Sequence, residues 1–462
     1  MDIDEDITIA TYLIDSYAKK LTSCARTDHA LEKEYTDALK KIAILRRTIH
    51  NDHSPNHWTL ALASCRTTIR TLALEIANYT MAPNWESPSY AHSLRPQAGR
   101  LAGKITGSIN DYTRDQHHYG WKYEEQFAKE YIDGIGKFAV HTYATSSGMA
   151  AFATILGYLR GERLSPSDKI VMGARSYFQN KELVSAWFGH NKIIWVDESD
   201  PTAIDAILKK IKPKAVILDT LTNAGKSVRL DVTALYRSIA AMGRPYPTLI
   251  LDNTCLATAC QPLKGTTKLL LGDMRLVVFE SLNKYHEFGM DRVTAGLVWG
   301  VGSDVGKLFT YRKNMGTNIP DASVIALPTP NRWMFDLRLR RLQRNCQYLA
   351  QELAEALGSK SSRWVRGVSY ATECTTFVLE FHKNHASLGT YKRFLHTLLA
   401  RARKQSVQIL AGTSFGLDHT RVYPVAAYTR EEPPFLRIAV GTEDMDTVKK
   451  IYDVLVDTCY NF

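Results

Sequence analysis

The segment from which the rest of this chain is best understood reads Arg275-Leu-Val-Val-Phe-Glu-Ser-Leu-Asn-Lys-Tyr-His-Glu-Phe-Gly-Met-Asp-Arg-Val-Thr-Ala-Gly296. Its apolar run at residues 276–279 has charged residues on both sides and is typical of a buried strand. The run ends in polar residues, and Lys284 follows just beyond them. Ligands of open α/β sheets bind outside the carboxyl ends of the strands. This position makes Lys284 a candidate functional residue. The alternative is a solvated loop lysine, which is the commoner case for a lysine considered alone.

Two earlier segments repeat this design. Residues 215–218 are apolar and are followed by Asp219, and residues 248–251 are apolar and are followed by Asp252. Uninterrupted apolar runs predict strands that are buried on both faces, and therefore a parallel sheet covered by helices. Residues 232–242 have a helical pattern, as a crossover between parallel strands requires. We therefore expect all three strands to present polar side chains at the same edge of one sheet.

The composition is that of an ordinary globular protein, with 45% hydrophobic and 23% charged residues among 462, enough for two or three domains. The formal net charge is +11. A basic surface attracts nucleic acid, but it equally suits an anionic cofactor and carboxylate substrates. Because the sequence contains no helix-turn-helix, zinc-finger or RNP-type signature, we expect no nucleic-acid partner.

The seven cysteines are odd in number and widely spaced, without a Cys-x-x-Cys pair. This pattern argues against a disulfide framework and against a zinc site. No apolar run approaches the roughly 20 residues that cross a bilayer. The chain begins with acidic residues rather than with the basic and apolar segments of a signal peptide. We therefore expect a cytoplasmic protein with no membrane partner.

The pattern of apolar residues divides the chain into three parts. Residues 1–110 are expected to form a helical N-terminal extension and a connecting arm, with helices over about 31–49 and 58–79. Residues 111–330 are expected to form a large domain of alternating helices and strands. Residues 331–462 are expected to form a smaller α+β domain, with helices over about 333–357 and 446–459 and strands at 375–381 and 436–441.

A small-residue turn precedes the first helix of the predicted large domain. Ser147 and Gly148 stand where a strand passes into a helix that continues to about Tyr158. The N-terminus of a helix offers unpaired N–H groups and a favourable dipole to an anion. The backbone N–H groups of Ser147, Gly148 and Met149 are therefore candidates to bind a phosphate, and the alternative is a simple helix cap with a glycine turn.

Several motifs, taken in their order and spacing, resemble those of fold-type I pyridoxal-phosphate enzymes. They are Ser146-Ser-Gly-Met-Ala-Ala151, Asp252-Asn-Thr254, Ser281-Leu-Asn-Lys-Tyr285 and Leu436-Arg-Ile-Ala-Val-Gly-Thr-Glu-Asp444. The closest resemblance is to the cystathionine γ-synthase / γ-lyase group of Cys/Met-metabolism enzymes, over about residues 110–462. The resemblance implies an α/β fold like that of aspartate aminotransferase. Its large domain has a mostly parallel, seven-stranded sheet and is joined to the smaller C-terminal domain.

The resemblance implies that Lys284 forms a Schiff base with pyridoxal 5'-phosphate and moves protons on the substrate. Asp252 matches the carboxylate that keeps the cofactor ring nitrogen protonated. Tyr177 matches the aromatic residue that stacks on the ring, and with Lys284 it is a candidate catalytic residue. Asn223 matches the residue that contacts the ring hydroxyl. The remaining cofactor-binding candidates are Ser147, Gly148, Met149, Thr254, Ser281 and Asn283.

Two further groups of residues follow from the resemblance. Tyr112 and Arg114 resemble the Tyr-x-Arg motif that reaches the cofactor phosphate of a neighbouring subunit, which implies a homodimer or homotetramer with shared active sites. Arg437 matches the arginine that binds the substrate α-carboxylate in a bidentate pair. Ser414 lies near the family's Ser-Leu-Gly motif, which also lines the carboxylate site.

The sequence departs from the family at three places near the expected substrate entrance, and one of them is the helical N-terminal region, which is longer than the typical arm. After Lys284 it reads Tyr-His-Glu-Phe-Gly-Met where the family has Tyr-x-x-Gly-His, and after Ser414-Phe-Gly it continues Leu-Asp-His-Thr-Arg. We therefore expect a divergent member with an altered substrate, in amino-acid or specialised metabolism. Asn283 also replaces the threonine that commonly precedes the lysine.

The implied activity is γ-elimination or γ-replacement on an amino acid with a leaving group at Cγ, through a vinylglycine-type quinonoid intermediate. The substrate would be an activated homoserine, cystathionine or S-adenosylmethionine, and a second, nucleophilic co-substrate would capture the product. The same cofactor also serves β-elimination, aldol-type cleavage and transamination, which the cofactor residues do not distinguish. The combined presence of Lys284, Asp252, Arg437 and Tyr177 disfavours a non-enzymatic basic binding protein on the same fold.

Overall fold

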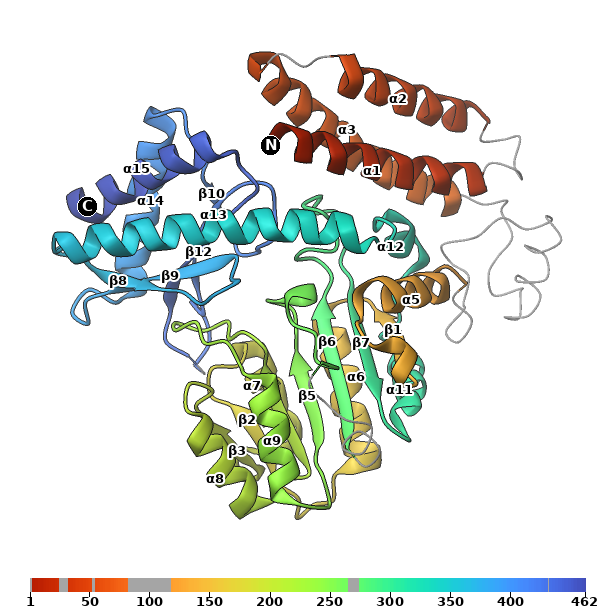
Figure 1. Ribbon diagram of the computed structural model, residues 1–462, viewed down its shortest axis with the longest axis vertical. Helices are drawn as coiled ribbons and strands as arrows, with labels where there is room; N and C mark the ends of the chain where they lie inside the picture. The colour runs from red at the N-terminus through yellow and green to blue at the C-terminus, as the bar shows by residue number, and fades with distance from the viewer. Residues whose placement is uncertain (1, 25–31, 52–54, 82–117, 265–273, 431) are drawn as a thin grey trace.

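The computed structural model describes residues 2–24, 32–51, 55–81, 118–264, 274–430 and 432–462. Tyr112 and Arg114 lie outside the described residues. Figure 1 shows three bodies of structure, with the larger sheet and its helices at the bottom, a smaller sheet at the upper left and three N-terminal helices at the top. Among the described residues, no helix has the length and apolar character needed to cross a membrane.

The larger sheet has seven strands in the order β1-β7-β6-β5-β4-β2-β3. Strands β2 to β6 pair in parallel, and β7 is antiparallel to both β1 and β6. The mostly parallel sheet expected from the sequence is therefore confirmed. The strands are β1 (His141–Thr145), β2 (Ile170–Gly173), β3 (Ile193–Val196), β4 (Ala215–Asp219), β5 (Thr248–Asp252), β6 (Arg275–Ser281) and β7 (Gly296–Val301).

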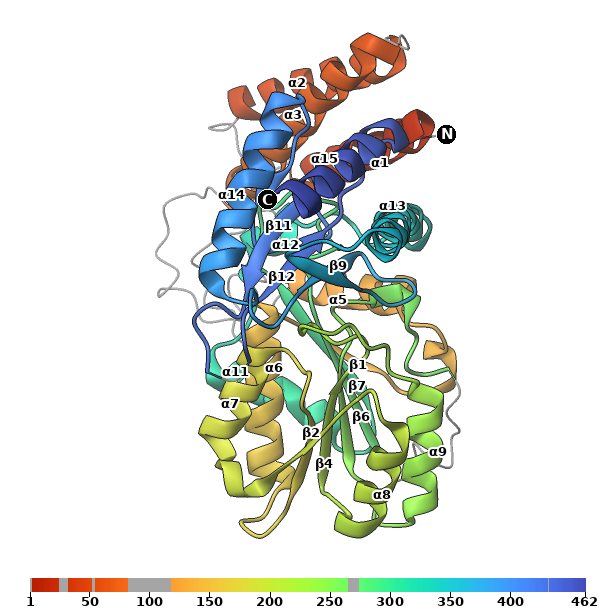
Figure 2. The ribbon, with the colours of Figure 1, turned by 90° about the vertical axis from the view of Figure 1, so that its left-hand side faces the viewer.

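The three predicted strands β4, β5 and β6 are neighbours, and Asp219 pairs in register with Asp252. Alternate residues of these strands face different helices. Ile250 and Val277 pack with α6, and Leu249 and Val278 pack with α9. Figure 2 shows α6 and α7 on one face of the sheet and α8 and α9 on the other. Burial on both faces explains why these strands are uninterrupted apolar runs.

The helices around this sheet are α5 (His118–Tyr131), α6 (Gly148–Tyr158), α7 (Phe178–Phe188), α8 (Pro201–Ile211), α9 (Val232–Met242), α11 (Leu308–Met315) and α12 (Asp321–Ala326). A π-helical turn at Leu159–Arg163 continues α6. Short 3-10 helices lie at Ile135–Lys137, His190–Lys192, Ala257–Ala259 and Val305–Lys307. The predicted crossover helix at 232–242 coincides with α9.

The smaller sheet has the order β10-β11-β12-β9-β8 and packs with helices α13, α14 and α15 around a second core. The strands predicted at 375–381 and 436–441 correspond to β9 and β12, which are antiparallel neighbours. The elements are α13 (Arg332–Ser359), β8 (Val365–Ser369), β9 (Thr376–Phe381), α14 (Leu388–Lys404), β10 (Leu410–Ala411), β11 (Arg421–Val425), β12 (Phe435–Ala439) and α15 (Met445–Asn461).

The N-terminal helices are α1 (Asp2–Cys24), α2 (Glu32–Asn51) and α3 (Pro55–Met81), which pack on one another. The helix expected over about 31–49 is α2, and its apolar residues Ala38, Ile42, Leu45 and Ile49, which recur at helical spacing, are buried. α1 also contacts α13, and α3 contacts α12. The Tyr17 hydroxyl donates to the Ala326 carbonyl oxygen at 2.6 Å. The three helices therefore form a body that lies on both of the other parts of the chain.

Candidate active site

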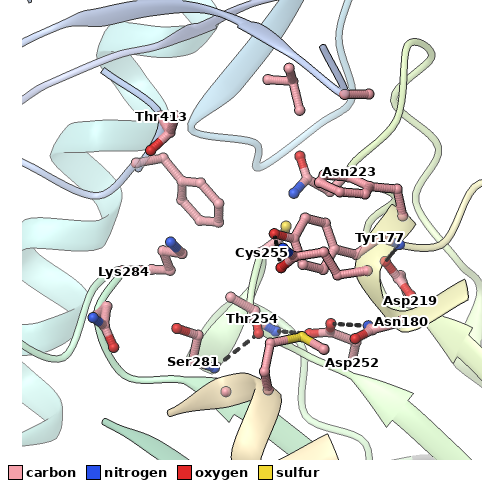
Figure 3. A pocket seen from close by; sticks show the side chains of 18 of the residues that line it. Tyr177, Asn180, Asp219, Asn223, Asp252, Thr254, Cys255, Ser281, Lys284 and Thr413 are labelled. Carbon is pink, nitrogen blue, oxygen red and sulfur yellow. Dashed lines mark hydrogen bonds between the residues drawn. The ribbon is translucent and has the colours of Figure 1, made fainter. Parts of the chain in front are cut away.

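A cavity of about 650 Å³ lies at the carboxyl ends of β4, β5 and β6, and residues 413–429 and β12 form its other side. Figure 3 shows the side chains that converge on it from these elements. The sequence-predicted residues among its lining are Ser147, Gly148, Met149, Tyr177, Asn223, Asp252, Thr254, Ser281, Asn283, Lys284 and Arg437. These residues come from widely separated parts of the sequence, and the sheet topology brings them together.

The amine of Lys284 points into this cavity (Figure 3). Its Nζ donates to the Ser414 hydroxyl oxygen at 3.0 Å and lies 5.2 Å from the centre of the Phe415 ring. Burial lowers the pKa of Lys284 to about 8, and the positive charge of Arg437 adds to this effect. About a tenth of this amine is therefore neutral at pH 7, against less than about a thousandth of an ordinary lysine, and the neutral form is the one that acts as a nucleophile or a general base.

The N-terminus of α6 packs directly on the end of β6. A Cβ atom at Gly148 would lie 2.8 Å from the Cβ of Ser281, so this approach requires glycine. The Ser147 hydroxyl caps the helix by accepting from the Ala150 N–H at 3.0 Å. Capping and anion binding are compatible, because the Gly148 and Met149 amides belong to the first turn and line the cavity. The turn can therefore serve both roles that the sequence allows, as a helix cap and as a potential anion site.

Asp252 is held by two donors. Its carboxylate accepts from the Thr254 N–H at 3.0 Å and from the Asn180 side-chain amide at 3.1 Å, while Thr254 Oγ1 accepts from the Ser281 N–H at 3.0 Å. Burial raises the pKa of Asp252, and the bonds from Thr254 and Asn180 oppose that rise. A cationic partner in the cavity would further favour the ionised carboxylate.

Sequence reasoning missed Asn180 and Asp219 as site residues. Asn180 follows Tyr177 by three residues and lies on the first turn of α7. This short spacing from a predicted site residue could have pointed to Asn180. Asp219 lines the cavity and accepts from the Tyr177 backbone N–H at 3.0 Å. Burial and the neighbouring charge of Asp252 raise the pKa of Asp219 well above its usual value. Asp219 stands at the end of a predicted strand, as Asp252 does, and this shared position could have identified it as a site residue.

Arg437 lies across the cavity from the strand ends. Its guanidinium donates to Asn223 Oδ1 at 2.7 Å and to the Thr413 carbonyl oxygen, and lies 5.4 Å from the centre of the Phe415 ring. Only 6% of the residue is exposed. The arginine is thus fixed in place and buried, which favours binding of a planar carboxylate.

The remaining candidates are placed as follows. Tyr177 presents its ring to the cavity, and its hydroxyl donates to Gln179 Oε1 at 2.7 Å. Asn283 accepts from the Ala295 N–H at 2.9 Å through Oδ1, so this oxygen orders the backbone. Ser414 does not itself line the cavity and contacts the Lys284 amine instead.

The residues present fit pyridoxal 5'-phosphate. The glycine-dependent contact between α6 and β6 provides a helix N-terminus for a phosphate, beside the Ser281 hydroxyl. The same cavity presents a buried amine, a carboxylate held by two donors and an aromatic ring. A carbonyl group, a ring nitrogen and a phosphate on one molecule would each have a partner of suitable chemistry here.

Comparison with solved structures identifies the fold as that of fold-type I pyridoxal-phosphate enzymes. A cystathionine γ-synthase from Xanthomonas oryzae pv. oryzae, solved with cystathionine, is 18% identical, with a TM-score of 0.60 over 81% of this chain and 99% of that chain. A cystathionine γ-lyase from Lactobacillus plantarum, solved with L-serine, is 19% identical, with a TM-score of 0.57 over 76% of this chain and 89% of that chain.

Residues 78–411 match the family model of the Cys/Met metabolism PLP-dependent enzymes, and the chain belongs to this family. It is therefore a PLP-dependent enzyme of a family of lyases and transferases. A curated relative, the bifunctional enzyme flvA of Aspergillus flavus, is 24% identical in an alignment of 326 residues that covers 66% of this chain. This chain spans only 38% of the length of that relative.

Proposed function

We propose that this enzyme catalyses γ-elimination or γ-replacement on an amino acid that carries a leaving group at Cγ. The placement of the Lys284 amine, with its lowered pKa, in the same cavity as the buried Arg437 guanidinium supports proton transfer at the substrate Cα, and the match to the Cys/Met metabolism family favours its extension to Cγ. Chemistry at Cγ requires one base to move protons at both Cα and Cβ, and a lysine on a flexible side chain suits that task.

Each residue then has a defined task. Arg437 would bind the substrate α-carboxylate in a bidentate pair, and the Lys284 amine would take the proton from Cα and then one from Cβ, so that the electron pair left at Cβ can expel the substituent at Cγ. Asp252, held by Asn180 and Thr254, keeps a proton on the cofactor ring nitrogen. Tyr177 covers the ring. When bound, pyridoxal 5'-phosphate supplies an electron sink for the negative charge that develops on the substrate.

The phosphate is proposed to lie between the α6 N-terminus and Ser281. Gly148 and Met149 would donate their backbone N–H groups, with Ser147 capping the helix behind them. Asn283 and Thr254 support this end of the cavity, and Asn223 is proposed to contact the ring hydroxyl. Tyr112 and Arg114 are proposed to reach the phosphate of a neighbouring subunit in a homodimer or homotetramer.

The leaving group is proposed to be an acyl oxygen of homoserine, the sulfur of cystathionine or the sulfonium of S-adenosylmethionine. The cavity lies within the roughly 300–1,000 Å³ range of sites for drug-sized ligands, which leaves room for the cofactor and a bulky substrate. Its lining includes the aromatic rings of Phe178, Tyr423 and Tyr428. Aromatic faces attract cations, so these rings would favour a sulfonium group. A second, nucleophilic co-substrate would complete a γ-replacement.

The alternative functions are β-elimination, aldol-type cleavage and transamination with the same cofactor. Lys284, Asp252 and Arg437 would serve each of these reactions in the same positions, because all begin at the substrate Cα. The reactions differ in whether a proton is also moved at Cβ before the bond breaks. That difference supplies the test.

The first experiment compares wild type with Lys284→Ala after pyridoxal 5'-phosphate has been added. We expect a visible band in the wild type that borohydride bleaches, leaving the label on Lys284, and no such label in the variant. Turnover of candidate amino acids in D₂O should then place deuterium at both Cα and Cβ of the recovered substrate or of the amino-acid product of a γ-replacement. Turnover with deuterium at Cα alone would exclude γ-chemistry, and a wild type that stays colourless with added cofactor would contradict the assignment of Lys284.

A further inference from the structure

The buried carboxylate of Asp418 connects the N-terminal helices with loops beside the candidate active site, in addition to the contacts of Tyr12 with Phe288 and of Tyr17 with Met290. Arg70 of α3 lies 2.8 Å from Asp418 Oδ2, and Arg338 of α13 lies 2.9 Å from Oδ1. Arg66 of α3 is also near, with 3.9 Å between its Nε and Oδ2. Burial alone would raise the pKa of Asp418, but these three charges outweigh it and hold the pKa below its usual value. The carboxylate is therefore ionised and bound from two directions.

Arg70 also contacts the segment that follows Lys284. The same Nη2 atom that meets Asp418 donates to the Gly289 carbonyl oxygen at 2.9 Å. Gly289 has a φ of +80°, and a Cβ atom there would lie 2.4 Å from Arg338 Nη2 and from Asp418 Oδ1. One side chain of α3 thus joins two loops, residues 284–291 and residues 413–418.

The 413–418 loop is in direct contact with the groups that act on the substrate. Arg338 donates to the Gly416 carbonyl oxygen at 3.1 Å, and Gly416 packs on the Lys284 backbone so tightly that a Cβ atom would lie 2.1 Å from the Lys284 carbonyl oxygen. Ser414 accepts from the Lys284 amine, and the Thr413 carbonyl accepts from Arg437. The position of this loop therefore sets the relative position of the base and the carboxylate-binding arginine.

The family match does not account for this connection. It begins at residue 78, so Arg66 and Arg70 precede it, and Asp418 lies beyond its end at residue 411. Asp418 also belongs to the stretch after Ser414 in which the sequence departs from the family motif. Arg66 and Arg70 thus precede the matched region, Asp418 follows it, and they meet each other in the fold.

We propose that Arg70 and Asp418 are a positioning pair, through which the N-terminal helices hold the 413–418 loop in the geometry that binds the substrate carboxylate. This inference rests on the proposed roles of Lys284 and Arg437, but it does not depend on whether the bond that breaks is at Cγ or Cβ. It assigns the N-terminal helices a role in substrate binding rather than in cofactor binding, since neither residue reaches the phosphate end of the cavity.

The test uses the full-length enzyme loaded with pyridoxal 5'-phosphate and the variant Arg70→Ala. Loss of a hydrogen bond to a charged group corresponds to a change of about ten-fold or more in an equilibrium constant, so we expect the KM of the turned-over amino acid to rise by at least about that factor. The visible band and the affinity for the cofactor should stay near those of the wild type. Arg70→Lys, which retains a charge opposite Asp418, should recover part of the lost KM.

A second readout does not require activity. In hydrogen exchange of the protein without cofactor, Arg70→Ala should speed exchange in peptides covering 413–418 and 285–291 and leave the β4 and β5 peptides unchanged. The matched control is Arg46→Ala, which breaks the exposed pair between Arg46 and Asp15 in the same helices, 2.7 Å apart, and should change neither readout.

Three outcomes would overturn the proposal. They are unchanged exchange and KM in Arg70→Ala, an equal effect of Arg46→Ala, and a loss of cofactor affinity that parallels the loss of substrate binding. If Arg70→Ala does not fold, Arg70→Gln replaces it, because glutamine can still donate to Gly289 but carries no charge for Asp418. Failure of the γ-chemistry alone would appear in the deuterium experiment and would leave the exchange result standing.

Discussion

At the scale of single residues, Lys284 has the most unusual environment. Its pKa of about 8 follows first from burial and then from the charge of Arg437. In the proposed role only the neutral Lys284 amine can attack the cofactor, so the rate of cofactor capture by the apoprotein should rise with pH through a midpoint near 8. Arg437→Gln removes the repelling charge, so protonation becomes easier and the midpoint should move upward, toward the ordinary lysine value of about 10.4.

The growth of the visible band after mixing measures this rate at each pH. Arg366→Gln is the control, because Arg366 pairs with Glu380 at an exposed position and should leave the midpoint in place. Equal midpoints for the wild type and Arg437→Gln would show that the arginine charge does not govern the lysine.

Gly148 provides the second prediction at this scale. In Gly148→Ala the new methyl group would lie 2.8 Å from Ser281 Cβ and 3.0 Å from Ser281 Cα, so the α6 N-terminus must move away from β6. We expect pyridoxal 5'-phosphate to bind about ten-fold more weakly or worse, since the helix N-terminus no longer faces the phosphate.

Equilibrium titration followed by absorbance measures that affinity. Gly358→Ala serves as the control, because no atom lies within 4 Å of the added methyl group and the position is near the end of α13. Wild-type affinity in Gly148→Ala would count against a phosphate at this helix.

At the scale of elements, the ends of three strands are tied together by a buried hydrogen-bond chain. The Thr220 hydroxyl donates to Asn253 Oδ1 at 2.9 Å, the Asn253 amide donates to Glu280 Oε1 at 3.0 Å, and Glu280 Oε2 lies 3.0 Å from His286 Nε2. The chain runs from β4 through β5 to β6 and then to the loop that carries Lys284. These hydrogen bonds satisfy buried polar groups at the strand ends and hold the three ends next to one another.

Removing the central member of this chain should destabilise the protein. Asn253→Ala removes the donor to the buried Glu280 Oε1 and leaves the Thr220 hydroxyl only the Asp252 carbonyl oxygen, at 3.2 Å, as its acceptor. An unsatisfied buried group costs about 1–3 kcal/mol. We therefore expect a lower thermal unfolding midpoint by calorimetry. Asn384→Ala, at an exposed turn position, should unfold like the wild type. An unchanged midpoint for Asn253→Ala would mean that the network contributes no stability.

The elements themselves follow from short-range patterns. Apolar runs at 215–218, 248–251 and 276–279 became β4, β5 and β6, and the helix expected at 232–242 is α9. The ends of other elements differ by a few residues from the expected ones. The helix expected from residue 58 begins at Pro55, because proline is well tolerated in the first turn of a helix.

At the scale of the whole molecule, shared active sites are the proposal to test. If Arg114 serves the phosphate site of a neighbouring subunit, Lys284→Ala and Arg114→Ala should each be inactive alone but partly active when mixed and allowed to exchange subunits. Each hybrid dimer then contains one site with both wild-type residues. Activity of the mixture is compared with the two unmixed variants under the same treatment. No gain on mixing, with exchange verified, would place Arg114 in its own subunit's site.

The larger sheet, the position of Lys284 beyond β6 and the likeness to PLP-dependent enzymes were all accessible from the amino-acid sequence. They depend on the length and polarity of local runs and on the order of short motifs, which chain packing does not change. The contacts of Asn180 with Asp252, of Asp219 with Tyr177, of Ser414 with Lys284 and of Arg70 with Asp418 were not accessible. Most of these pairs are far apart in the sequence, and a side chain's direction is settled only when the elements pack, so these contacts belong to the folded molecule alone.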